Sequence, residues 1–260
     1  MNTLSMTWPE FLQQGAFGLM LVLARVAGAI SLLPGLGEQG APSMVRAGLA
    51  LCLALLLLPA LLPHLPPAPE SGLRAGMMIM AEALTGLWFG WLARLVALAL
   101  PMAAQVIAYL LGLSSVLQPD AQLGPQSTSF ARLFDLAAPV MVLSTGLYQL
   151  PLAALADLYR LIPPGSLLPE ADATQGAVEL VARSFDLALR LAAPFVLAAI
   201  AWNLASGLIA RLVPRLQVYF AALPGQILGG LVMLMLLTGV ILAAWGGAAR
   251  VMFGALPGTG

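Results

Sequence analysis

The feature that most constrains this chain is a series of apolar runs, each long enough to form a helix that crosses a lipid bilayer. Such a helix needs about 20 apolar residues, because it rises about 1.5 Å per residue through a hydrocarbon core about 30 Å thick. Runs of about this length or longer start near Phe11, Val45, Gly72, Ser129, Gly176 and just after Pro214. We therefore expect an all-α, polytopic integral membrane protein with long kinked helices and helical hairpins.

The composition supports this expectation and excludes several classes of protein. Hydrophobic residues make up 61% of the chain and charged residues only 8%, whereas a soluble domain carries about 25% charged residues. The formal net charge is zero, which argues against a nucleic-acid binder. The chain has no lysine, so the lysine of a Walker-A phosphate-binding loop is absent. Cys52 and His64 are the sole residues of their types, so neither a disulfide within the chain nor a His/Cys metal site is expected. We predict no cofactor and no enzymatic activity.

Proline and glycine clusters predict where the helices begin and end. The third helix is expected to be kinked or restarted at Pro101, with a further piece that reaches Val116. The first ten residues include Glu10 and no basic residue, and the apolar run behind them contains Arg25. The first helix is therefore expected to be retained rather than cleaved as a signal peptide. The predicted helices are Phe11–Leu33, Val45–Leu62, Gly72–Leu100, Ser129–Leu161, Gly176–Val213 and a last one from after Arg215 to Phe253.

Four charged residues lie on one stripe of the Gly176–Val213 helix. Their spacing of four, three and four residues places them on one helix face with alternating signs. Each charge at the bilayer centre costs roughly 2.5–3.5 kcal/mol on insertion scales, so this stripe does not face lipid. It forms either a solvated, salt-bridged helix end, a surface paired with neighbouring protein, or a functional relay. The four residues are Glu179, Arg183, Asp186 and Arg190.

Other charged residues inside apolar segments also occur with residues of opposite sign. We expect structural ion pairing within a helical assembly for all of them. They are Arg132 with Asp135, Asp157 with Arg160, and Glu82 with Arg94 on the third helix.

Pairs of glycines four residues apart occur on two of the predicted helices. Small residues at this spacing let two helix backbones approach closely. The pairs are Gly86 with Gly90 and Gly225 with Gly229.

Five stretches spread over nearly the whole chain form an ordered set. They are Arg25-Val26 leading to Pro42 and Val45–Ala50, then Glu82-x3-Gly86-x3-Gly90-x3-Arg94, then Gly112-Leu113-Ser114 with Pro119-Asp120 and Arg132-x2-Asp135, then Tyr159–Gly165, and last Asn203–Tyr219. In this order they resemble the FliR family, the flagellar biosynthesis proteins of the type III export apparatus.

The resemblance implies a non-enzymatic core subunit of the flagellar export gate. Such proteins assemble with FliP and FliQ into a conical helical complex in the bacterial inner membrane, at the flagellar basal body. FlhB and FlhA join nearby, and unfolded flagellar proteins pass through the centre. The whole chain, 1–260, would be a single membrane domain, with a FliP-like part at 1–170 and a FliQ-like hairpin at 171–260.

The resemblance also assigns a plug loop and a hairpin tip. The plug loop spans about 112–126 and would help to close the channel; its named residues are Gly112, Leu113, Ser114, Pro119, Asp120 and Gly124. The tip of the hairpin would contain Arg211, Pro214 and Arg215. Because arginine is enriched in cytoplasmic loops, the Arg211/Arg215 end is expected to face the cytoplasm.

Two alternatives remain open from the residues alone. One is a small-solute secondary transporter that uses Glu82, Arg94 and the Glu179–Arg190 charges near a central site, with helices broken at Pro101 and Pro139. The other is the injectisome counterpart of the export gate. An intramembrane enzyme is not favoured, because the chain offers no nucleophile–base pair.

Overall fold

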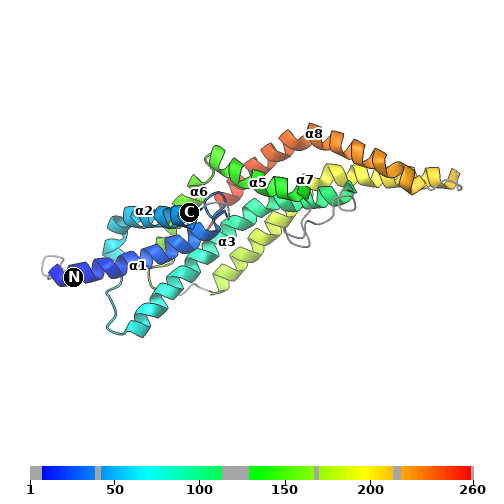
Figure 1. The fold of residues 1–260 in the computed structure, drawn as a ribbon. Coiled ribbons are helices and arrows are strands. Elements are labelled where there is room, and N and C mark those ends of the chain that lie inside the picture. The colour runs from blue at the N-terminus through cyan, green and yellow to red at the C-terminus, as the bar shows by residue number, and fades with distance from the viewer. Residues whose placement is uncertain (1–7, 39–41, 113–128, 167–169, 213–217, 259–260) are drawn as a thin grey trace. The chain divides into compact units, whose positions relative to one another are not determined.

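The computed structural model describes residues 8–38, 42–112, 129–166, 170–212 and 218–258. All regular elements in these ranges are helices (Figure 1), which confirms the predicted all-α class. The elements are α1 (Trp8–Leu32), α2 (Ser43–Leu61), a 3-10 turn η2 (Leu62–His64), α3 (Gly72–Leu110), α5 (Ser129–Ser144), α6 (Gln149–Leu161), α7 (Glu170–Leu212) and α8 (Val218–Phe253).

Five of these helices are long and apolar enough to cross a membrane: α1, α2 with η2, α3, α7 and α8. Helices α5 and α6 pass the same test together, but they are bent by 72° where they meet. The protein is therefore a polytopic membrane protein, as the apolar runs predicted.

The prediction of one helix over Ser129–Leu161 is wrong, because the chain breaks between α5 and α6. Gly146 lies at this break with φ +74°, a backbone conformation that glycine adopts without steric cost and that ends a helix. By contrast, α3 continues as one helix through Pro101 over 39 residues. The final helices agree more closely with the prediction, although α7 starts at Glu170 rather than Gly176.

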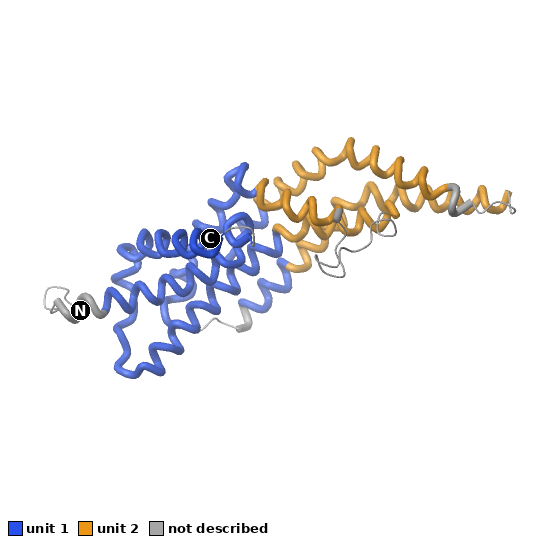
Figure 2. The backbone as a smooth tube through the Cα atoms, in the orientation of Figure 1, with its two compact units in different colours: residues 1–96, 142–180, 251–260 blue, residues 97–141, 181–250 orange. Residues whose placement is uncertain are grey.

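The chain divides into two compact units, which Figure 2 shows in different colours. Unit 1 comprises residues 1–96, 142–180 and 251–260, and unit 2 comprises residues 97–141 and 181–250. Helices α3 and α7 contribute to both units.

The core of unit 1 is built where α1 packs against α3. Helix α1 buries apolar side chains at the helical period, among them Leu21, Val26 and Ile30. On α3, a side-chain carbon at Gly86 would collide with the carbonyl oxygen of Arg25, and one at Gly90 would lie 2.5 Å from that of Ala29. The first predicted glycine pair is thus confirmed as the place where two helix backbones meet.

The core of unit 2 is built from α3, α5, α7 and α8. Its largest buried side chains are Trp245 and Phe195, which are at most 1% exposed. The second glycine pair behaves differently from the first. A side-chain carbon at Gly225 would lie 3.1 Å from the Trp202 ring, whereas one at Gly229 would have no neighbour within 4 Å.

Candidate functional site: a buried arginine–glutamate pair

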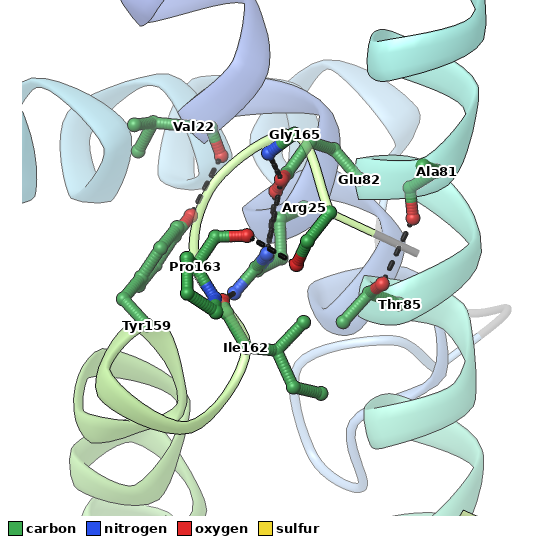
Figure 3. Close-up of polar contacts among 10 residues, drawn as sticks. Val22, Arg25, Ala81, Glu82, Thr85, Tyr159, Ile162, Pro163 and Gly165 are labelled. Atoms are coloured by element: carbon green, nitrogen blue, oxygen red, sulfur yellow. Dashed lines mark hydrogen bonds and ion pairs between the residues drawn. The ribbon is translucent and has the colours of Figure 1, made fainter. Parts of the chain in front are cut away.

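Arg25 of α1 and Glu82 of α3 form an ion pair in the interior of unit 1 (Figure 3). The Arg25 Nε donates to Glu82 Oε2 at 2.6 Å, and Nη2 donates to Oε1 at 3.0 Å. Both side chains are 0% exposed. The two parallel bonds make the bidentate fork in which a guanidinium holds a carboxylate most strongly.

The segment after α6 provides further partners for both charges. The Arg25 Nη1 donates to the carbonyl oxygen of Ile162 at 2.9 Å. The backbone N–H of Gly165 donates to Glu82 Oε1 at 2.6 Å. A buried ion pair is tolerated when further hydrogen bonds satisfy its donors and acceptors, and here the backbone of 162–165 supplies them.

Tyr159 of α6 covers the guanidinium from a third side. The Arg25 Cζ lies 4.2 Å from the centre of the Tyr159 ring, a distance at which a cation is attracted to the face of an aromatic ring. The Tyr159 hydroxyl donates to the carbonyl oxygen of Val22, one turn before Arg25 on α1, over 3.5 Å. The ring and the hydroxyl therefore both join α6 to α1.

Two glycines let the three segments come this close together. Gly86 lies one turn after Glu82 and makes the backbone contact with Arg25 described above. Gly165 has φ +79°, and a side-chain carbon there would lie 2.5 Å from the Met78 Cε. Any other residue at 165 would be strained, and its N–H would be displaced from Glu82.

The arrangement acts as a clasp between parts of the chain that are distant in sequence. Its bonds join residues 57, 83 and 137 positions apart. Neither charge is accessible, so the clasp has no surface on which to bind a substrate. Removing one partner of such a buried pair leaves the other charge uncompensated and costs about 3–5 kcal/mol.

The structure places the other predicted charges of unit 1 outside this clasp. Arg94 does not pair with Glu82, because its partner is Glu38, with 3.8 Å between Nη1 and Oε1. Asp157 and Arg160 are 3.6 Å apart on α6 and largely exposed. These residues and Glu82 all form ion pairs within the chain, although two of the partners, Arg25 and Glu38, were not predicted.

The predicted charges of unit 2 lie on outward faces. The Arg132 Nη1 and Asp135 Oδ2 are 2.5 Å apart on α5. On α7, the Arg190 Nε and Asp186 Oδ2 are 2.7 Å apart. All four residues of the Glu179–Arg190 stripe are exposed, although Glu179 itself belongs to unit 1.

Most residues of the predicted plug loop and hairpin tip lie outside the described residues. Gly112 is described, with φ +73°, two residues after the end of α3. Arg211 is described as an exposed residue in the last turn of α7. The others fall in the ranges 113–128 and 213–217, namely Leu113, Ser114, Pro119, Asp120, Gly124, Pro214 and Arg215.

Sequence reasoning missed Arg25, Tyr159 and Gly165 as members of the site. A signal for Arg25 was present, because an arginine in the middle of an apolar run needs a carboxylate partner in another run. Three of the five family-like stretches contribute to the clasp, namely those at Arg25, Glu82 and Tyr159–Gly165. Within the described residues, no group of three or more His, Cys, Asp or Glu side chains could hold a metal ion.

The chain was compared with known proteins. The pattern of the bacterial export proteins, family 1, matches residues 16–252. The flagellar biosynthetic protein FliR of Caulobacter vibrioides is 33% identical over 225 residues, 86% of this chain and 90% of that protein. The protein of the same name in Bacillus subtilis is 27% identical over 245 residues, 93% of this chain and 90% of that protein. That of Escherichia coli K12 is 26% identical over 204 residues, 78% and 77% of the two chains.

Proposed function

The chain belongs to the bacterial export proteins of family 1, and from this premise we propose that it is a core subunit of the flagellar type III export gate. It is a membrane component of the flagellar export apparatus, and its family is not an enzyme class. In the proposal it forms, together with FliP and FliQ, the channel through which unfolded flagellar proteins pass. The observation that carries this proposal is the outward-facing surface of α7 and α8.

Helices α7 and α8 bury little of their apolar surface inside the chain. In their most apolar stretches, 11% of the residues of α7 and 17% of those of α8 are buried, against 56% of those of α3. The Ser43–His64 span, with 11% buried, is exposed to the same degree as α7. Large exposed side chains include Leu204 and Leu208 on α7 and Met235 and Leu236 on α8. A self-contained transporter encloses its site among its own helices, whereas a subunit leaves such faces for its partners.

Lipid alone does not account for the whole surface of α7. At about 1.5 Å per residue, its 43 residues extend over about 65 Å, twice a hydrocarbon core of about 30 Å. The exposed charges Arg183, Asp186 and Arg190 lie among exposed apolar residues such as Phe185 and Leu189. A surface of this mixed kind favours contact with protein or with a water-filled space over contact with lipid tails.

The geometry of Glu82 weighs against a small-solute transporter. That alternative places the Glu82 carboxylate near a central binding site. In unit 1 its two oxygens accept three hydrogen bonds, from Arg25 and from the Gly165 N–H, and its side chain is fully buried. A carboxylate that accepts three hydrogen bonds and has no exposed surface is not accessible to a solute.

The remaining parts of the proposal concern the arrangement of the chain in the apparatus. The protein resides in the inner membrane at the flagellar basal body, with FlhB and FlhA nearby and with Arg211 and Arg215 on the cytoplasmic side. Residues 1–170 act as the FliP-like part and 171–260 as the FliQ-like hairpin. The segment of about 112–126 acts as the plug.

Co-purification tests the proposed assembly. The full-length chain, tagged and expressed with FliP and FliQ, is extracted in detergent and the mass of the intact complex is measured. We expect one complex that contains all three proteins. A stable chain that purifies alone from the same cells and binds a small solute would contradict the proposal.

A deletion tests the plug separately from the assembly. Removal of Gln118–Pro125 is expected to make the closed complex leak small solutes, measured as dye release from vesicles that contain the complex. Replacing the same residues by a Gly/Ser segment of equal length distinguishes loss of the loop's sequence from loss of its length. Unchanged permeability in a deletion variant that assembles normally would contradict the gating role and leave the assembly proposal intact.

A further inference from the structure

Helices α1 and α2 line an open hollow of about 140 Å³ at the surface of unit 1. The two helices pack along each other, as blue and light-blue ribbons in Figure 1. Small residues such as Ala27 and Ala47 leave the space open, and polar side chains enter its wall at Ser31, Ser43 and Arg46. The hollow is separate from the clasp, which does not include any of these residues.

Arg46 is the unusual member of this wall. Its Nε is buried, and within the described residues it has no hydrogen-bond partner. The Ser31 hydroxyl donates to the carbonyl oxygen of Gly28 at 2.6 Å, so its proton is already engaged. No lining residue is acidic. A buried guanidinium nitrogen with no acceptor in reach costs free energy unless a ligand provides one.

The start of α2 adds to the positive potential of the hollow. Ser43 and Arg46 lie in its first turn, which contains no acidic residue, and Pro42 before it makes no side-chain cap. The free backbone N–H groups of a helix N-terminus and the helix dipole both favour an anion at this position. The arginine, the helix end and the empty volume therefore all favour the same kind of ligand.

The position of Arg46 on α2 identifies the source of the anion. The segment Ser43–His64 is one of the candidate membrane spans, and Arg46 lies in its first turn. If this segment spans the bilayer, that end of it meets the lipid headgroups. Apolar side chains near it, Met44 and Val45, are exposed. We propose that this hollow binds the phosphate of an anionic phospholipid, with Arg46 on the phosphate and the acyl chains along the exposed face of α2.

The lining distinguishes this ligand from two others. A zwitterionic lipid also carries a phosphate, but its ammonium group would find no carboxylate among the lining residues. Free inorganic phosphate would gain nothing from the apolar wall or from the exposed face of α2. The inference rests on residence in the membrane and does not depend on the identity of the partner subunits.

Native mass spectrometry of the full-length protein, with the subunits that co-purify, tests the proposal. Detergent-extracted protein is titrated with phosphatidylglycerol, with phosphatidylcholine or with inorganic phosphate. We expect retention of phosphatidylglycerol at concentrations at which phosphatidylcholine is lost. We expect Arg46→Gln to weaken this retention on the order of tenfold and Arg46→Lys to weaken it less, because lysine keeps the charge without the fork.

Two further variants separate binding from folding. Arg74→Gln is the matched control, since Arg74 also lies near the start of an apolar helix but is exposed, and it should retain the lipid. Ala47→Phe keeps Arg46 but fills the hollow, and it should lose the lipid. Equal retention by the wild type and Arg46→Gln, equal retention of the two lipids, or displacement of the lipid by millimolar inorganic phosphate would overturn the proposal. It would also be overturned if Arg46→Gln released a partner subunit and left lipid retention unchanged.

Discussion

The Arg25–Glu82 pair of unit 1 and the Asp186–Arg190 pair of unit 2 have similar local geometry, with 2.6 Å and 2.7 Å between their closest atoms. Their surroundings differ completely. The first pair is 0% exposed and joins segments that are distant in sequence, whereas the second is more than half exposed on each side chain and lies within one turn of α7. The distance between the charges therefore does not by itself determine how much an ion pair contributes to the stability of the fold.

The two pairs therefore have different roles. Solvent and side-chain entropy reduce an exposed pair within one helix to about 0–1 kcal/mol. A buried pair is costly to break, because one charge is left without a partner in a medium that solvates it poorly. We therefore expect unit 1 to depend on its pair for folding, and α7 to be free to use its charges for contacts outside the chain.

The largest expected effect comes from breaking the buried pair. Glu82→Ala leaves the Arg25 guanidinium buried with the Ile162 carbonyl as its remaining acceptor, and should destabilise the protein by about 3–5 kcal/mol. Thermal unfolding in detergent and the amount of protein in the membrane measure this loss. Asp186→Ala, which removes an exposed carboxylate, is the control. An unchanged midpoint for Glu82→Ala would remove the distinction between the two pairs.

Exchanging the two charges tests whether opposite signs alone stabilise unit 1. The double variant Arg25→Glu with Glu82→Arg keeps the net charge and the opposite signs. It should recover only part of the stability, because the carboxylate no longer meets the Gly165 N–H and the guanidinium no longer meets the Ile162 carbonyl. The thermal midpoint should lie between those of the wild type and Glu82→Ala. Full recovery would mean that charge alone, without the backbone partners, stabilises unit 1.

A glycine substitution tests the close packing that the pair requires. Gly86→Ala places a methyl group against the Arg25 carbonyl and should destabilise the protein by about 1–3 kcal/mol. Gly76→Ala is the matched control on the same helix, since a side-chain carbon there has no neighbour within 4 Å. It should be neutral or stabilise the helix by up to about 1 kcal/mol. Shifts of the same sign in the two thermal midpoints would contradict this packing.

The fold was predictable from sequence as far as it depends on local pattern. Apolar runs and their breakers locate most of the helices, although α3 continues past Pro101 and α7 starts at Glu170 rather than Gly176. The break at Gly146 was missed because glycine is also common inside membrane helices, so that its positive φ is decided by tertiary packing. The same limit applies to Glu82, because its partner lies 57 residues away and spacing along one helix suggested Arg94 instead.

The site was predictable only in part, for a related reason. A buried charge in an apolar run indicates that a partner exists, but not which segment supplies it. The Ile162 carbonyl and the Gly165 N–H are backbone groups, which almost every residue has. No sequence pattern therefore indicates which of them meet a buried charge. The Arg183, Asp186 and Arg190 charges are exposed in the chain, and whether they meet water or neighbouring protein, as the sequence left open, stays a prediction.

A smaller effect is expected from the aromatic side of the clasp. Tyr159→Leu removes the ring from the Arg25 guanidinium and should cost about 1–2 kcal/mol, because a desolvated cation–π contact is worth up to about 2 kcal/mol. Tyr159→Phe keeps the ring and loses the 3.5 Å bond to Val22, so it should cost less. The order of the two thermal midpoints shows whether the ring or the hydroxyl of Tyr159 contributes more to stability. If Tyr159→Phe were as damaging as Tyr159→Leu, the hydroxyl and not the ring would be the important group.

The smallest effect on stability is expected for the exposed pair on α7. Asp186→Asn should change the free energy of unfolding by at most about 1 kcal/mol. If α7 meets a partner subunit, the same variant should reduce the yield of the intact complex. Asp157→Asn is the matched control, because Asp157 also forms an exposed pair within one helix, with Arg160 of α6. Equal yields from the two variants would favour a solvated helix end for the Glu179–Arg190 stripe. A loss confined to Asp186→Asn would favour a stripe paired with neighbouring protein.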